Sequence, residues 1–135
     1  MRHAFQALPG LAGRARPVVD LVVEGLELAP QACLLDTGAT EVRMGAHVAE
    51  LAGIELDESL LTQEAVIGGL QTTRVAAAVR LELRQGEERH AWSSTVYFCD
   101  PWHWAFGLLG LAGMDPFRVT IDSCEEWSEL RLRRG

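Results

Sequence analysis

Residues 32–44, ACLLDTGATEVRM, contain an acidic side chain whose position suits chemistry. Asp36 directly follows the apolar pair Leu34-Leu35, and such a run is typical of a short buried strand. Gly38 has no β-carbon, so its backbone N–H can approach the carboxylate closely, and the Thr37 hydroxyl can brace the turn. We therefore expect the Asp36 carboxylate to be held rigidly at the end of a strand.

A rigid carboxylate can catalyse hydrolysis when a second acid lies beside it. Two carboxyl groups about 3 Å apart cannot both ionise, so they share one proton. The ionised group can take a proton from water while the protonated group donates to a substrate carbonyl, with no covalent intermediate. Ala39 keeps the surroundings of Asp36 small, which suits such a pair.

Asp-Thr-Gly alone is also compatible with a simple Asx turn after a strand, with no chemistry. A second stretch of similar type, Asp122-Ser123-Cys124, has Cys in the place of Gly. It ends the apolar stretch FRVTID, and we assign it no catalytic role. The residues that flank Asp36 are therefore needed to choose between the two interpretations.

The stretch LLDTGAT, residues 34–40, resembles the active-site signature of the retropepsin-like aspartic proteases, the retroviral-type family. Three further stretches match that family in the correct order. VIGGLQTTRV, residues 66–75, stands where the family carries a glycine-tipped flap hairpin, and Leu108-Leu109-Gly110 matches its second signature. FRVTID, residues 117–122, matches the strand that follows in many bacterial and cellular members. The resemblance covers about residues 17–132.

The resemblance implies an aspartic endopeptidase that needs no metal and no cofactor, with Asp36 as its catalytic residue. The supporting residues would be Thr37, Gly38 and Ala39. The flap residues would be Val66, Ile67, Gly68, Gly69 and Leu70, closing over an extended peptide substrate. The candidate pocket residues would be Phe106, Leu108, Leu109 and Gly110.

One motif per chain has a consequence for assembly. Two-lobed aspartic proteases carry two such motifs in one long chain, whereas this chain has one in 135 residues. The second carboxylate must then come from Asp36 of a second copy, which requires a two-fold homodimer. The alternative is a non-catalytic dimeric scaffold or peptide-binding module with the same fold. A retained Asp36 favours the enzyme, because a scaffold gains nothing from two crowded carboxylates.

The chain departs from the viral pattern at two positions. Viral members usually have an acidic residue directly after D-T-G-A and an arginine after the late glycine, and these two pair. Here the positions are Thr40 and Leu111, so both partners are missing together. This places the chain nearer the bacterial and cellular branch, and it leaves open how the dimer edge is braced.

The hydrophobic pattern predicts an all-β fold, arranged as a small closed barrel, with one short helix near residues 45–52. Val48, Leu51 and Ala52 would share the buried face of this helix, and Gly53 would end it. The resemblance implies that the barrel is a single-lobed acid-protease barrel. Apolar residues recur at every second position over residues 74–84, which predicts a strand with one solvent-exposed face. The Val- and Leu-rich stretch PVVDLVVEGLEL, residues 17–28, is interpreted as strand with a hairpin tip at Glu24-Gly25, and Gly68-Gly69 is expected at another tip. Residues 1–16 are interpreted as a loose N-terminal arm, and 17–135 as the protease domain. The aromatic stretch CDPWHWAFG, residues 99–107, is either local core under a loop or one wall of the substrate cleft.

Composition limits the other classes of function. Hydrophobic residues make up 48% of the chain and the net charge is −7, which argues against nucleic acid and anionic membranes as partners. No apolar run approaches the roughly 18 residues of a membrane span. Three cysteines without C-x-x-C spacing predict reduced thiols and a cytoplasmic location.

Overall fold

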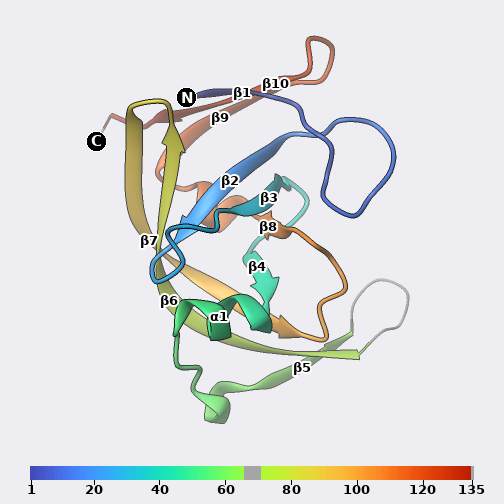
Figure 1. The fold of residues 1–135 in the computed structure, drawn as a ribbon, viewed down its shortest axis with the longest axis vertical. Coiled ribbons are helices and arrows are strands. Elements are labelled where there is room, and N and C mark those ends of the chain that lie inside the picture. Colours follow the sequence, from blue (N-terminus) through green and yellow to red (C-terminus); the bar gives the residue numbers. More distant parts are fainter. Residues whose placement is uncertain (66–70, 135) are drawn as a thin grey trace.

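The computed structural model describes residues 1–65 and 71–134 (Figure 1). The chain folds into strands with one short α-helix among the described residues, as the sequence predicts. The strands are β1 (Arg2–Ala4), β2 (Val18–Val23), β3 (Gln31–Leu35), β4 (Val42–Gly45), β5 (Thr62–Ala65), β6 (Gln71–Gln85), β7 (Glu88–Asp100), β8 (Gly107–Leu109), β9 (Phe117–Asp122) and β10 (Trp127–Leu132). The helices are α1 (Ala46–Ala52) and the short 3-10 turns η1 (Glu58–Leu60) and η2 (Leu111–Met114). None of these helices has the length and apolar character needed to cross a membrane.

Six strands close into a barrel. They follow one another in the order β2-β3-β8-β4-β7-β6, and β6 pairs back to β2 through Leu21↔Leu83 and its neighbours. Strand β5 pairs with β6 and lies outside this ring. The ring mixes parallel pairs, β3–β8 and β4–β7, with antiparallel ones. Closure leaves the ring without a free edge, and the expected small closed barrel is confirmed.

The long hairpin β6–β7 follows the alternation of its sequence. Val75, Val79, Leu81 and Leu83 are buried on β6, while charged residues alternate with the last three. They pack with residues of the other strands into the main core, where Phe98 and Phe117 are among the largest fully buried side chains. Burial of such a continuous apolar face is the main stabilising contribution to a sheet of this size.

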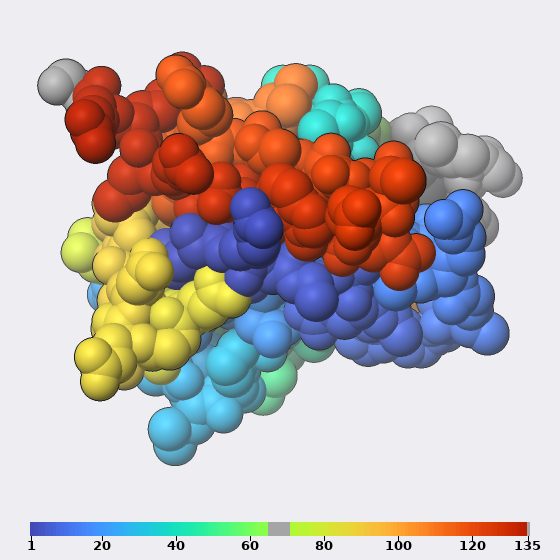
Figure 2. Space-filling view, turned by 90° about the horizontal axis from the view of Figure 1, so that it is seen from above, coloured from blue at the N-terminus to red at the C-terminus, as the bar shows by residue number. Residues whose placement is uncertain are grey.

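The ends of the chain form a second, three-stranded sheet in the order β1-β10-β9. Figure 2 shows the N-terminal segment in dark blue beside the C-terminal strands in orange and red. The backbone N–H of Leu130 donates to the Met1 carbonyl at 2.8 Å, and Leu8 is buried against Val18. The segment expected to be a loose arm is therefore attached by a backbone ladder and by a buried side chain. A sequence pattern of three residues cannot reveal such pairing.

Two local expectations need correction. The Glu24-Gly25 turn begins the β2–β3 connection at residues 24–30, but no strand continues through Leu28, whose side chain is fully exposed. Helix α1 ends at Gly53 as expected, with φ +72°. Its buried face contains Val48 and Ala49, whereas Leu51 is 66% exposed instead of facing the core. In so short a helix the position of the neighbouring strands decides which side is covered.

Candidate active site

Asp36 lies one residue beyond β3, at the point where the barrel wall ends. Leu35 is buried, and the backbone N–H of Asp36 donates to the Leu109 carbonyl at 3.1 Å. The side chain of Asp36 itself is only partly buried. The strand therefore brings the carboxylate to the rim of the core and leaves it accessible.

The turn after Asp36 closes on the carboxylate. The backbone N–H of Gly38 donates to Asp36 Oδ1 at 2.9 Å, which is the contact that the sequence predicts. The N–H of Ala39 donates to the Asp36 carbonyl at 3.2 Å. A β-carbon on Gly38 would lie 3.2 Å from Oδ1, closer than nearly all real contacts of this kind. Glycine therefore allows the N–H to orient one carboxylate oxygen, while the other accepts no hydrogen bond from the residues that the structure describes.

The second signature packs directly on this turn. The N–H of Leu111 donates to the Ala39 carbonyl at 2.9 Å, and the N–H of Ala112 donates to the Thr40 carbonyl at 2.8 Å. A β-carbon on Gly110 would lie 2.3 Å from the Glu41 carbonyl oxygen. Gly110 is therefore required by this close approach of two backbones. Backbone hydrogen bonds join the two segments at the positions where the charged pair of viral members is missing.

The candidate pocket residues occupy different environments in one chain. Leu109 is fully buried in the main core, and Phe106 is 9% exposed in a small cluster with Leu8 and Val18. Leu108 is partly exposed on the opposite face of β8, where it packs against the same small cluster as Phe106. Leu108 is thus the apolar candidate that a substrate could contact in this arrangement of one chain.

The aromatic stretch around residue 104 is divided between the core and the surface. Trp102 donates its indole N–H to the Phe106 carbonyl at 3.0 Å, so it braces the loop that enters β8. Trp104 lies 5.7 Å from Phe106 between ring centroids and is half exposed. Phe106 is therefore local core, while Trp104 forms part of the surface.

The expected flap residues, Val66–Leu70, lie outside the described residues. The two strands that lead to them, β5 and β6, form an antiparallel pair from Thr62↔Arg74 to Ala65↔Gln71.

A hollow of about 470 Å³ opens beside the Asp36 turn. Its lining combines apolar side chains with one acidic and one basic residue. The residues are Thr37, Leu111, Met114, Asp115, Phe117, Val119, Ile121 and Arg133. It joins the Asp36 turn to strand β9 of the terminal sheet.

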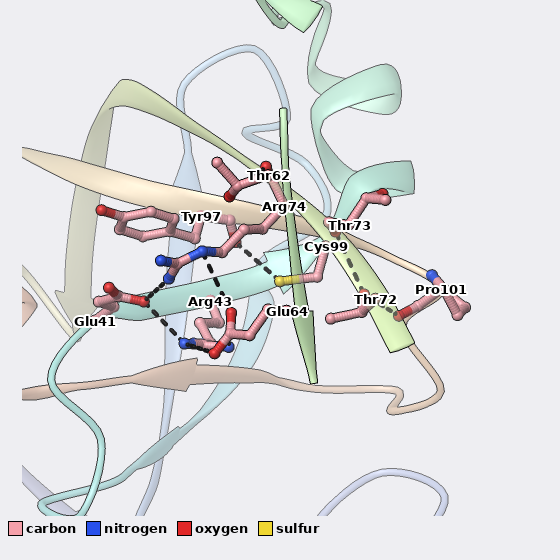
Figure 3. A network of polar contacts seen from close by, with 10 residues as sticks. All are labelled: Glu41, Arg43, Thr62, Glu64, Thr72, Thr73, Arg74, Tyr97, Cys99 and Pro101. Atoms are coloured by element: carbon pink, nitrogen blue, oxygen red, sulfur yellow. Dashed lines mark hydrogen bonds and ion pairs between the residues drawn. The ribbon is translucent and has the colours of Figure 1, made fainter. Parts of the chain in front are cut away.

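Sequence reasoning missed a cluster of four charged residues near this site (Figure 3). Arg43 on β4 makes a two-pronged contact with Glu64 on β5, at 3.1 Å and 2.9 Å. Glu41 accepts from Arg43 at 3.0 Å and from Arg74 on β6 at 2.7 Å. A clue was available in Arg43, a charge between the buried Val42 and Met44, but its partners are distant in sequence.

The contacts in this cluster affect the pKa values of its members. The hydrogen bond from Arg43 is the main cause that lowers the pKa of Glu64, and the nearby charges of Arg43 and Arg74 add to it. The bond to Glu64 likewise raises the pKa of Arg43. Burial raises the pKa of the neighbouring Cys99 thiol. Both shifts favour the ionised forms of Glu64 and Arg43.

The remaining candidates have structural explanations or lack a cluster of ligands. Asp122 accepts the backbone N–H groups of Cys124 and Glu125 at 3.0 Å and 2.9 Å, which is an Asx-type turn between β9 and β10. Burial raises the pKa of Cys33 to about 12, so its thiol packs in the core in the protonated form. In the described part of the chain, no group of three or more His, Cys, Asp or Glu residues is placed to hold a metal ion.

No family model matches the chain, and no curated protein matches it in sequence. Among solved structures, it is similar to a retropepsin-like aspartic protease from Rickettsia conorii, with a TM-score of 0.58 and 12% sequence identity. The match covers 95% of this chain and 97% of that one. Identity at this level is evidence for the fold alone. The barrel described here is therefore a retropepsin-like fold, with Asp36 at the end of one of its strands.

Proposed function

We propose that this protein is an aspartic endopeptidase that works as a two-fold homodimer, with Asp36 of each subunit forming the catalytic pair. The observation that carries the proposal is the hydrogen-bonded turn after β3, in which the Gly38 N–H orients one oxygen of the accessible Asp36 carboxylate. The likeness of the fold to a retropepsin-like aspartic protease supports the same reaction class. That likeness is secondary to the geometry of the site, because one fold can host several functions.

The surface beside Asp36 offers a place for the second copy. Leu111 is 50% exposed and Ile121 is 37% exposed, and both line the hollow that begins at Thr37. The backbone edge of β9 that faces away from β10 has no pairing partner among the described strands. Exposed apolar side chains next to a free strand edge are typical of an interface.

The charges in the hollow also suit a copy of the same surface. Asp115 and Arg133 bring one negative and one positive side chain to it. In a two-fold contact each surface meets itself, so a patch with both signs can pair Asp115 of one subunit with Arg133 of the other. This arrangement would bring the two Thr37 residues, and with them the two Asp36 carboxylates, toward the axis.

In the proposed reaction, the pair holds one proton. The ionised carboxylate accepts a proton from a water molecule, whose oxygen attacks the peptide carbonyl carbon. The protonated carboxylate donates to the carbonyl oxygen, giving a tetrahedral intermediate. When this collapses, the C–N bond breaks, the nitrogen takes a proton from the pair, and one hydroxyl of the intermediate returns a proton to it, so the pair again holds one. The Gly38 N–H keeps the carboxylate in the plane that these transfers need.

An extended peptide would be the substrate. It would add main-chain hydrogen bonds in the manner of a strand, and partly exposed apolar residues such as Leu108 would contact its side chains.

Hydrolysis of a peptide library, measured together with mass in solution, tests the proposal. We expect cleavage by the wild-type protein at concentrations where it is dimeric, and none by Asp36→Asn. A dimer that binds peptides without cleaving any would instead identify a non-catalytic peptide-binding module.

A further inference from the structure

The cluster Glu41, Arg43, Glu64 and Arg74, here called the charge cluster, joins three separate parts of the chain. Glu41 and Arg43 come from the segment that follows the Asp36 turn, Glu64 from β5 and Arg74 from β6. Every member contacts two others, since Arg74 Nε also lies 3.3 Å from Glu64 Oε2. Figure 3 shows the four side chains converging between the strands.

The position of β5 makes this cluster more than a surface ion pair. Strand β5 lies outside the closed barrel and pairs with β6 alone among the described strands. Its backbone thus has one ladder of hydrogen bonds, and Glu64 adds a side-chain connection to Arg43 on β4. Strand β4 is itself part of the barrel, between β8 and β7. The charge cluster therefore connects an edge strand to the rigid wall beside the active site.

The geometry of the charge cluster restricts the position of Glu64 relative to Arg43. A guanidinium that makes two parallel bonds to one carboxylate restricts both distance and orientation. The four side chains are only 18–28% exposed, so solvent screens them less than it screens ordinary surface pairs. Two acids balance two bases, and the Arg74 guanidinium also lies 4.5 Å from the ring centroid of Tyr97. Removing one carboxylate would leave Arg43 and Arg74, both largely buried, with a single acidic partner.

The charge cluster also lies on the face of the sheet that bears Leu108, the partly exposed pocket candidate. Arg43 is the cross-strand partner of Leu108 on one side and of Tyr97 on the other. Directly opposed residues on neighbouring strands project from the same face. A peptide that contacts Leu108 would thus lie next to the charge cluster.

We propose that the charge cluster is a positioning device, in which Glu64 holds the edge strand β5 and the adjoining part of β6 against the wall that carries Asp36 and Leu108. Its effect on peptide binding rests on the proposed function, but its effect on β5 does not. Glu64 acts here through Arg43 and is a positioning residue, with no part in proton transfer.

Hydrogen exchange in the whole protein tests this directly, because it needs no substrate. In Glu64→Gln we expect amide exchange in residues 62–65 and 71–75 to become about tenfold faster, with exchange in β2 and β3 unchanged. The matched control is Glu82→Gln, on the neighbouring strand β6, which removes a carboxylate paired with Arg84 and Arg89. It should leave exchange in β5 as in the wild type. Equal exchange of β5 in Glu64→Gln and the wild type would overturn the proposal.

A double variant separates attachment from charge balance. Arg43→Met with Glu64→Gln restores neutrality but leaves β5 unattached, so we expect exchange in β5 to stay fast. Recovery of slow exchange in this double variant would show that only charge balance matters, and it would also overturn the proposal.

Peptide hydrolysis provides the functional measurement. If the wild type is active, Glu64→Gln should raise KM about tenfold with a smaller change in kcat, whereas Glu82→Gln should change neither. A lower kcat at unchanged KM would contradict a positioning role at the binding face. A wild type that cleaves no peptide would count against the proposed function, while the exchange results would still decide the role of Glu64.

Discussion

The backbone N–H of Leu111 donates to the carbonyl of Ala39 at 2.9 Å, so the residue after Leu-Leu-Gly is bonded to the residue after Asp-Thr-Gly. Two short stretches that are far apart in sequence thus form one structural unit around Asp36. Gly110 allows this unit to form, since any side chain there would collide with the Glu41 backbone.

Gly110→Ala should therefore lower the free energy of unfolding by about 1–3 kcal/mol. The segments around Gly110 and Glu41 cannot move apart to admit a β-carbon without breaking the hydrogen bonds to the Ala39 and Thr40 carbonyls. Chemical denaturation measures the loss. Gly38→Ala is the contrasting variant, since its β-carbon would lie 3.2 Å from the movable Asp36 Oδ1. It should unfold at nearly the wild-type denaturant concentration and lose activity instead. Equal stability of Gly110→Ala and the wild type would contradict the packing described here.

Asp36→Asn should abolish peptide hydrolysis and preserve the fold. The asparagine oxygen can still accept the Gly38 N–H, but the amide cannot share a proton with its partner. Asp122→Asn is the matched control, because Asp122 also caps a turn and accepts backbone N–H groups. We expect wild-type rates from the control, with a maximum at mildly acidic pH. Full activity in Asp36→Asn would remove Asp36 from the mechanism.

Leu111→Arg should convert the proposed dimer to a monomer at micromolar concentration and abolish the proposed activity. The change places a charge in the apolar hollow while leaving the backbone bond to Ala39 in place. Leu51→Arg, on the exposed side of α1, serves as the control and should remain dimeric. Native mass spectrometry distinguishes the two states. A monomeric wild type with full activity would refute the shared site.

Phe106→Ala and Leu108→Ala should have different effects. Phe106 is buried with Leu8 and Val18, so its truncation should cost about 3–5 kcal/mol of stability. Leu108 is partly exposed, so its truncation should cost less and should weaken the preference for bulky apolar residues beside the cleaved bond. Thermal melts and cleavage-site profiles measure the two effects. A changed profile in Phe106→Ala with an unchanged melting temperature would show that its ring faces the substrate.

The thiols should react very unequally. Burial raises the pKa of Cys33 to about 12 and also raises that of Cys99, so both remain protonated and inaccessible at pH 8. Cys124 is exposed. A thiol reagent should therefore label one cysteine per native chain and three after denaturation. The Cys124→Ser variant should show none in the native state; fast labelling there would indicate that the core opens.

Patterns within short stretches allowed much of the barrel to be predicted. The alternation along β6 predicted which side chains enter the core, because successive residues of a strand point to opposite faces. Gly53 predicted the end of α1 because glycine adopts positive φ without strain. The buried face of α1 could not be predicted in the same way. Leu51 is exposed, whereas Val48 and Ala49 are buried, because the strands around so short a helix decide which of its sides is covered.

The sequence by itself determined the chemistry available at Asp36. A carboxylate, a following glycine and a single copy of the motif are properties of the chain, and they suffice to predict the contact from Gly38 and to pose the question of a second subunit. Only the tertiary structure decided that Phe106 and Leu109 are buried, that β1 pairs with β10, and that Glu64 meets Arg43. These contacts join residues that are distant in sequence, where neither periodicity nor turn chemistry constrains the partner. They exist because closing the barrel brings those strands together.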